Sequence, residues 1–270
     1  MTAPEASLLV VLSIAGVSKE FQLKGGAKVT ALASTTLDIK EGEFVSVIGP
    51  SGCGKSTLFN IIGGLLESDT GRILVDGREI RGSHKDIGMV FQEESVFPWR
   101  TVIGNVTLPL EIAGVPKKER YERAMHFVEL VGLTGFENRR PSELSGGMRQ
   151  RTALARTLAS EPRILLMDEP FAALDEQTRM LIGDKIVQIW RELNQTTLLI
   201  THNLTEAIQL SDRVVVMSYR PGTIKQIVQI ELPRPRTSEI ISSEPFRRYL
   251  GQIWQDLREE ATRGMIESKI

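Results

Sequence analysis

A glycine-rich segment carries the most specific chemistry in this sequence. Residues 49–57 read GPSGCGKST and match the pattern G-x-x-x-x-G-K-[ST]. A short apolar run at residues 44–48 precedes the segment, and a helical pattern runs from about residue 55 to residue 66. Glycines allow successive backbone N–H groups to turn toward one point, and the start of a helix adds positive potential there. The pattern therefore predicts a loop that holds the phosphates of a nucleotide, although kinases and GTPases share it.

Each residue of this phosphate loop has an expected part. We expect Lys55 to reach the β- and γ-phosphates, the Ser56 hydroxyl to coordinate Mg²⁺, and Thr57 to contact the α-phosphate side. The other positions present mainly backbone to the nucleotide: Gly49, Pro50, Ser51, Gly52, Cys53 and Gly54. Cys53 is the single cysteine of the chain, and its thiol is not expected to be catalytic. Our hypothesis is that bound nucleotide shields this thiol and that its modification blocks binding.

Two carboxylates follow a second apolar run at residues 164–167. Asp168 and Glu169 come directly after it, and the ends of parallel strands face the ligand crevice of such a sheet. Asp168 can hold Mg²⁺ directly or through water, and Glu169 can act as the general base for an attacking water. Such an acidic pair is common after strands, but together with the phosphate loop upstream it favours nucleotide hydrolysis.

A second candidate phosphate site begins at Ser145. The segment 144–151 reads LSGGMRQR, in which Ser145, Gly146 and Gly147 open a helix, and a helix N-terminus attracts phosphate. One chain has no evident need for two such sites on one γ-phosphate. Two copies packed head to tail would use both, with the loop of one copy opposite Ser145 of the other. The sequence therefore predicts a homodimer that binds ATP at its interface.

The segment LSGGM resembles the signature of the ATP-binding cassette (ABC) ATPases, and the resemblance covers about residues 8–230 with the family's motifs in order. It implies that Gln92 touches Mg²⁺ and the attacking water, and that His202 contacts the γ-phosphate. It also implies that Asp175 belongs to the loop that contacts the second copy. Phe21 lies where an aromatic ring stacks on adenine in this family, with a core strand aromatic as the equal alternative.

Within the family, further segments resemble the branch that serves nitrate, sulfonate and taurine uptake. These are residues 97–106, with FPW followed by TV and NV, the block 147–151, and MSYRPG at residues 217–222. The same resemblance implies that Pro98 and Trp99 dock on a membrane subunit, whereas a packed turn is the structural alternative. Three positions depart from the family pattern: Met148, Ala172 and Asn203. None of them removes a catalytic group, so they bear on rate and on dimer affinity.

The expected fold is α/β, a P-loop NTPase with a RecA-like parallel-sheet core, an antiparallel β-subdomain and an inserted α-helical subdomain. The ATPase domain is expected at residues 8–230, divided into a nucleotide-binding core with its β-subdomain (8–92 and 161–230) and a helical subdomain (93–160). Residues 231–270 read as a proline-containing linker and an amphipathic helix. Phe246, Leu250, Ile253 and Leu257 form its apolar face, with helix packing favoured over regulation.

Composition limits the function classes. The chain of 270 residues has a formal net charge of −1, which argues against a broad nucleic-acid surface. The longest early apolar run, at residues 8–17, is shorter than a membrane span and lacks a basic flank, so it favours a β-strand. We therefore expect a protein on the cytoplasmic face of the membrane. It would associate with two transmembrane permease subunits and, through them, with an extracytoplasmic solute-binding protein.

The leading hypothesis is an ATP-hydrolysing motor for import of a small anion or an organosulfur-type solute, with ATP and Mg²⁺ as cofactors. A soluble kinase or GTPase is disfavoured by the segment 144–148, by His202 and by the lack of an N-K-x-D stretch. A cassette that regulates a non-transport complex, and an exporter, remain as alternatives. The sequence of the motor does not encode the transported solute.

Overall fold

The computed structural model describes residues 9–23, 25–172, 187, 193 and 195–267. Its strands form two sheets. They are β1 (Val10–Gln22), β2 (Lys28–Lys40), β3 (Phe44–Ile48), β4 (Thr70–Val75), β5 (Arg78–Ile80), β6 (Ile87–Val90), β7 (Ile164–Asp168), β8 (Thr196–Ile200), β9 (Arg213–Met217) and β10 (Ile224–Gln229). Its helices are α1 (Lys55–Ile62), α2 (Val102–Val106), α3 (Leu108–Ile112), α4 (Lys117–Leu130), α5 (Gly146–Ala159), α7 (Leu204–Leu210) and α8 (Glu244–Glu267), with two 3₁₀ turns, η1 (Pro141–Glu143) and η2 (Ser238–Ser242).

The larger sheet provides the framework for the site. Its strand order is β10-β9-β3-β8-β7-β6, and the neighbouring pairs are parallel except for β9 with β10. Strands β3, β7 and β8 are buried along their whole length, because helices or the other sheet cover both faces. Their sequences are mostly apolar, which suits burial on both faces, and these strands form the parallel core that the sequence predicts.

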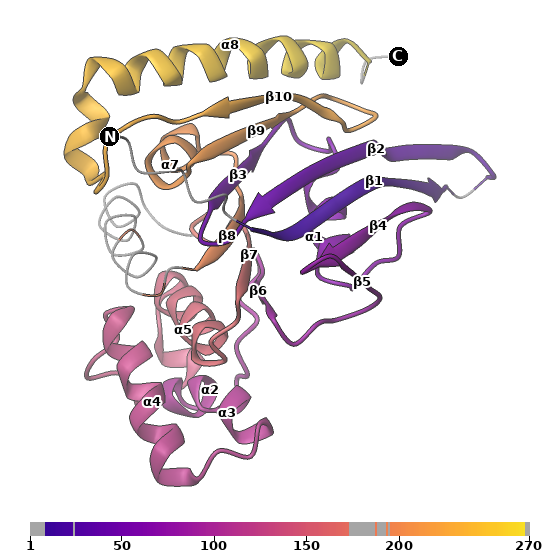
Figure 1. Ribbon diagram of the computed structural model, residues 1–270. Coiled ribbons are helices and arrows are strands. Elements are labelled where there is room, and N and C mark those ends of the chain that lie inside the picture. Colours follow the sequence, from indigo (N-terminus) through magenta and orange to yellow (C-terminus); the bar gives the residue numbers. More distant parts are fainter. Residues whose placement is uncertain (1–8, 24, 173–186, 188–192, 194, 268–270) are drawn as a thin grey trace, which may run out of the picture.

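The smaller sheet is antiparallel, with the order β2-β1-β4-β5. The tight turn between β4 and β5 contains Asp76 and Gly77, both with positive φ, as the Asp-Gly pair predicts. Side chains of β1 and β2 pack with α1 and the larger sheet in one apolar cluster that includes Leu12, Ile39 and Phe59. Helices α2 to α5 form a block at one end of the larger sheet (Figure 1), and their apolar residues, Phe127 and Leu158 among them, pack in one cluster with residues of that sheet such as Phe44 and Leu199.

The C-terminal helix α8 runs along β10 and β9 (Figure 1). The four apolar residues predicted for its inner face all lie in one cluster with α7 and β9, and Phe246 and Ile253 are fully buried. Burying a side chain of this size stabilises the attachment by about 1.5–3 kcal/mol. Arg236, in the proline-containing segment before α8, is also buried and donates hydrogen bonds to the carbonyls of Leu232, Ile208, Ser211 and Ile230.

No helix of the described residues is long and apolar enough to cross a membrane.

Candidate nucleotide-binding and hydrolysis site

The phosphate loop joins the end of β3 to the start of α1. Gly54 is the residue before the helix and has φ 100°, a left-handed value that favours glycine. A Cβ atom at this position would lie 2.6 Å from the carbonyl oxygen of Ala31, so the loop also lies directly against β2. The sequence therefore needs glycine here for two independent reasons, backbone conformation and close packing.

Lys55 is buried at the centre of this loop. Its Nζ donates hydrogen bonds to the carbonyl oxygens of Gly49, at 2.8 Å, and Pro50, at 3.1 Å. The ammonium group is therefore held within the turn whose backbone would surround the phosphates. An ammonium in this position can offer its charge to a phosphate group without a large movement of the chain.

The structure brings three predicted catalytic residues to one carboxylate oxygen. Oε2 of Glu169 lies 3.1 Å from Nδ1 of His202 and 3.3 Å from Nε2 of Gln92. These residues follow β7, β8 and β6, which are neighbours in the larger sheet. The carboxyl ends of neighbouring parallel strands meet at one edge of a sheet, and this topology places the group together.

Glu169 has an unusual backbone conformation. Its φ is 45°, a left-handed value that costs a non-glycine residue about 1–3 kcal/mol. Its backbone N–H donates to the carbonyl of Ile200 at 2.8 Å, which fixes the turn after β7. Strain of this kind persists where the surrounding structure holds it, and it often marks a functional site.

Asp168 connects the acidic strand end to the phosphate loop. Burial raises the pKa of its carboxyl group, and the neighbouring Glu169 adds to this effect, whereas a hydrogen bond with Ser56 and the charge of Lys55 oppose it. The hydroxyl of Ser56 and the carboxylate of Asp168 are hard oxygen donors, which are the ligands that Mg²⁺ prefers. The donor set that the sequence predicts for Mg²⁺ is therefore chemically suited to that ion.

The helix α5 begins at Gly146, as predicted, with Ser145 as its N-cap. The Ser145 Oγ accepts a hydrogen bond from the N–H of Met148 at 3.3 Å. Ser145 is exposed, and α5 lies in the helical block, apart from α1, which begins at the phosphate loop (Figure 1). A ligand could therefore approach the start of α5 from outside the chain.

Side chains of α5 hold the segment that carries Gln92. Arg149 forms an ion pair with Glu94, and its Nη1 donates to the carbonyl of Leu144 at 2.6 Å. Nε2 of Gln150 donates to the carbonyl of Phe91 at 2.9 Å. The sequence reasoning did not identify these contacts, and the only signal for them is the polar character of this helix face.

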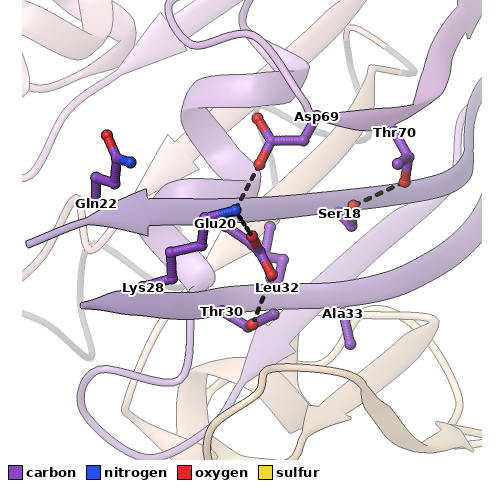
Figure 2. Close-up of a pocket in the computed structure, with 9 residues that line it drawn as sticks. All are labelled: Ser18, Glu20, Gln22, Lys28, Thr30, Leu32, Ala33, Asp69 and Thr70. Carbon is purple, nitrogen blue, oxygen red and sulfur yellow. Dashed lines mark hydrogen bonds and ion pairs between the residues drawn. The ribbon is translucent and has the colours of Figure 1, made fainter. Parts of the chain in front are cut away.

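Phe21 lies near the end of β1, opposite Val29 of β2, and is 39% exposed. Its neighbours Glu20 and Gln22 line a pocket of about 670 Å³, shown in Figure 2. In this pocket the Glu20 carboxylate accepts a hydrogen bond from the Thr30 hydroxyl, and the backbone N–H of Glu20 donates to the Asp69 carboxylate. Successive side chains of a strand point to opposite faces, so Phe21 belongs to the other face. No residue of the phosphate loop lines this pocket.

Two other predictions have different outcomes. Asp175 lies outside the described residues. The structure does not support the hypothesis that nucleotide shields Cys53, because the protein itself buries this side chain completely. That modification of the thiol blocks ATP binding stays a prediction. Burial also raises the pKa of the Cys53 thiol, against the smaller opposing effect of Lys55.

We therefore expect Cys53 to react slowly with maleimide in the folded protein, with or without Mg-ATP, because the buried thiol is inaccessible and protonated. Quantitative labelling should appear only in denaturant, and mass spectrometry of timed samples measures it. Rapid labelling of the native protein that saturating Mg-ATP suppresses would contradict the buried placement and restore the shielding hypothesis.

Comparison with known proteins decides the family. The family described as ABC transporter matches residues 32–172, which is just over half of the chain. An uncharacterized ABC transporter ATP-binding protein of Methanocaldococcus jannaschii is 49% identical over 92% of both chains. The chain belongs to the ABC transporter ATPase family. This cassette is therefore an ATPase that binds ATP and serves transmembrane transport, which confirms the resemblance and the predicted enzyme class.

Two named relatives also match the cassette over nearly their whole length. The nitrate import ATP-binding protein NrtD of Synechocystis sp. is 44% identical over 93% of this chain and 96% of its own. The aliphatic sulfonates import ATP-binding protein SsuB of Bacillus cereus is 41% identical over 97% of this chain and 100% of its own.

Solved structures confirm the predicted fold class. The dimeric structure of the ABC transporter cassette MJ0796 is 33% identical, has a TM-score of 0.73 and covers 82% of this chain and 100% of its own. A second structure of MJ0796 is described as a post-hydrolysis state bound to ADP and Pi, and its TM-score to this chain is 0.72 at 32% identity. The two-sheet framework and the helical block of this cassette thus belong to a known ATPase architecture.

Proposed function

We propose that this cassette is the ATP-hydrolysing motor of an importer for a small anion or an organosulfur-type solute. The observation that carries the proposal is the Glu169 carboxylate, held between His202 and Gln92 at the edge of the sheet that also leads into the phosphate loop. The names of the nitrate and sulfonate import relatives support the solute class and the direction of transport.

In the proposed reaction, Glu169 accepts a proton from the attacking water while His202 contacts the γ-phosphate. The hydrogen bond from Gln92 and the close contact with His202 orient the carboxylate before reaction, so it needs no rearrangement when the water attacks. Lys55 and the backbone N–H groups of the phosphate loop bind the phosphates, and Phe21 stacks on the adenine. Ser56, Gln92 and Asp168 would hold Mg²⁺, which supplies charge neutralisation on the phosphate oxygens.

The proposed functional unit contains two copies of the cassette. The loop of one copy and Ser145, Gly146 and Gly147 of the other would bind the same ATP, with Asp175 at the contact between copies. The dimeric structure of MJ0796 supports this arrangement, as does the exposed N-terminus of α5. ATP then favours the closed dimer because it binds that state more tightly than the open one.

We propose that Trp99 docks on a permease subunit, so that the dimer is a peripheral protein on the cytoplasmic face of the membrane. Trp99 is 68% exposed, and Phe97 lies beside it with ring centroids 5.3 Å apart. Arg156 of α5 places its guanidinium carbon 5.2 Å from the centre of the Phe97 ring. Since α5 begins next to Ser145 and carries Arg156, this contact would transmit movement of α5 at the predicted ATP site to the docking surface.

Purification from native membranes tests the proposal. We expect an affinity-tagged cassette to bring down a multi-span permease and an extracytoplasmic solute-binding protein, and ligand screening of the latter identifies the solute. Trp99→Ala should lose most of the permease but keep the ATPase rate of the isolated cassette. Trp254, on α8, is also exposed, at 58%, so Trp254→Ala serves as the matched control. Detergent-solubilised membranes that yield no permease with the wild-type chain would contradict a transport function.

A further inference from the structure

A loop that follows β9 lies directly against the phosphate loop. This loop comprises residues 218–222, and we call it the bracing loop. Nε of Arg220 donates a hydrogen bond to the carbonyl oxygen of Gly52 at 2.9 Å. A Cβ atom on Gly222 would lie 1.9 Å from the carbonyl oxygen of Cys53, so these two backbones are in close contact. The bracing loop therefore fixes two successive peptide groups of the phosphate loop.

The bracing loop is itself closed and attached to β2. The hydroxyl of Ser218 accepts a hydrogen bond from the N–H of Thr223 at 3.0 Å, and Ser218 N–H donates to the carbonyl of Thr223 at 2.9 Å. Gly222 exchanges backbone hydrogen bonds with Ala31 and Ala33 of β2, at 3.1 and 3.0 Å. The same region of β2 touches Gly54. These contacts leave the bracing loop little freedom to move independently of the phosphate loop.

The C-terminal helix α8 holds the other side of the bracing loop. Oε2 of Glu260 accepts a hydrogen bond from the N–H of Tyr219 at 2.9 Å. Gly264, one turn further along α8, lies against the Tyr219 ring, where a Cβ atom would come within 2.7 Å of the ring carbon Cε2. Oε1 of Glu260 lies 3.2 Å from Nζ of Lys225, and Oε2 also lies 3.7 Å from Nη1 of Arg263, so both carboxylate oxygens have partners.

Glu260 is only 3% exposed, which is rare for a carboxylate. Burial opposes its ionisation, but the Tyr219 N–H and Lys225 outweigh this effect and hold the pKa of Glu260 below its usual range. A buried, ionised carboxylate that accepts a backbone N–H fixes that backbone more firmly than an apolar contact would. Helix packing alone does not require such a group, since Phe246 and Ile253 already attach α8.

We propose that Glu260 and Arg220 are positioning residues for ATP binding: α8, through Glu260, holds the bracing loop, and the bracing loop holds Gly52 and Cys53 in the shape that receives the phosphates. The direction of each N–H group in the phosphate loop depends on the peptide groups on either side of it. Displacing the Gly52 or Cys53 carbonyl therefore turns the donors away from the phosphates. The inference rests on the proposed role of residues 49–57.

The test compares Glu260→Ala with Glu259→Ala. Glu259 is the adjacent residue of α8, pairs with the same Lys225 and is largely exposed, so it is a matched control that does not contact the bracing loop. We expect Glu260→Ala to raise Kd for a fluorescent ATP analogue, and KM for ATP, by about threefold to tenfold, the value of one strong hydrogen bond. The kcat should stay within about twofold, because ground-state and transition-state binding weaken together.

Two further variants separate positioning from simple packing. Glu260→Gln keeps an oxygen that accepts the Tyr219 N–H and should restore most of the ATP affinity. Arg220→Ala removes an exposed side chain, should fold normally, and should raise Kd to a similar extent. Because both residues act on the same loop, the double variant Glu260→Ala/Arg220→Ala should weaken binding by less than the product of the two single effects.

The inference is overturned if Glu260→Ala lowers the melting temperature but leaves Kd and KM for ATP at wild-type values, or if Glu259→Ala raises them equally. Lys55→Ala distinguishes this failure from failure of the proposed site. If that variant binds the ATP analogue as tightly as the wild-type cassette, the phosphate loop itself has been wrongly assigned. If Lys55→Ala loses binding while Glu260→Ala does not, only the role of α8 is wrong.

Discussion

Glu169→Gln should bind ATP and form a stable dimer while its hydrolysis rate falls by about 10²–10⁴-fold, the usual contribution of a general base. The amide keeps the size of the side chain and can still contact His202 and Gln92, but it cannot accept a proton from water. ATP should therefore accumulate at the dimer interface. Phosphate release measures the rate, and size-exclusion chromatography with and without ATP measures the dimer.

A nearby exposed carboxylate provides the control for this variant. Glu93 follows Gln92 directly, so Glu93→Gln changes the charge close to the site without touching the Glu169 carboxylate. Its rate should stay within about twofold of wild type, since surface substitutions away from a defined contact have small effects. A normal hydrolysis rate for Glu169→Gln would show that another group activates the water.

Ser145→Glu should keep ATP binding in the phosphate loop but lose both ATP-dependent dimerisation and hydrolysis. The N-terminus of α5 is expected to receive the γ-phosphate held by the second copy. A carboxylate there places negative charge against negative charge and removes the serine hydroxyl. We expect the hydrolysis rate to fall by about 10²-fold or more, comparable to the loss of a transition-state charge donor.

The control for this variant is Ser142→Glu. Ser142 is an exposed serine in the 3₁₀ turn η1, three residues before Ser145. It carries the same change in charge and size but lies outside the helix N-terminus. Hydrolysis and dimerisation should stay near wild type. Equal losses in both variants would attribute the effect to general charge on this surface, and full activity of Ser145→Glu would remove the signature helix from the site.

The sequence predicted the parallel core well because its signals are local. The apolar runs coincide with β3 and β7 to within one residue, and Ser145 caps α5 at the expected position. The helix after the phosphate loop ends at Ile62, earlier than the predicted Leu66, because Gly63 and Gly64 end it. The strand β10 was not predicted, because its sequence mixes polar and apolar residues and only Val228 is buried.

The residues of the candidate site were predictable from motifs, but their contacts were not. Gln92, Glu169 and His202 lie far apart in the chain. The order of β6, β7 and β8 places them at one edge of the sheet, and the side-chain distances show that Gln92 and His202 meet at one oxygen of Glu169. The contact between Glu260 and Tyr219 joins two elements whose sequences have no shared pattern. Such long-range polar contacts depend on the packing of α8, which periodicity alone does not determine.

The central claim is that one ATP is bound by two copies of this cassette, and mixing two inactive variants tests it most directly. Lys55→Ala disables the phosphate loop and Ser145→Glu disables the signature helix, so each homodimer should be inactive. A mixed dimer contains one intact site, formed by the loop of the second variant and the helix of the first. With equal amounts of the two variants pairing at random, half of the dimers are mixed, and each mixed dimer has one intact ATP site out of two. The account therefore predicts that mixing restores hydrolysis to about a quarter of the wild-type rate. A mixture as inactive as its components, with mixed dimers demonstrably present, would contradict the shared site.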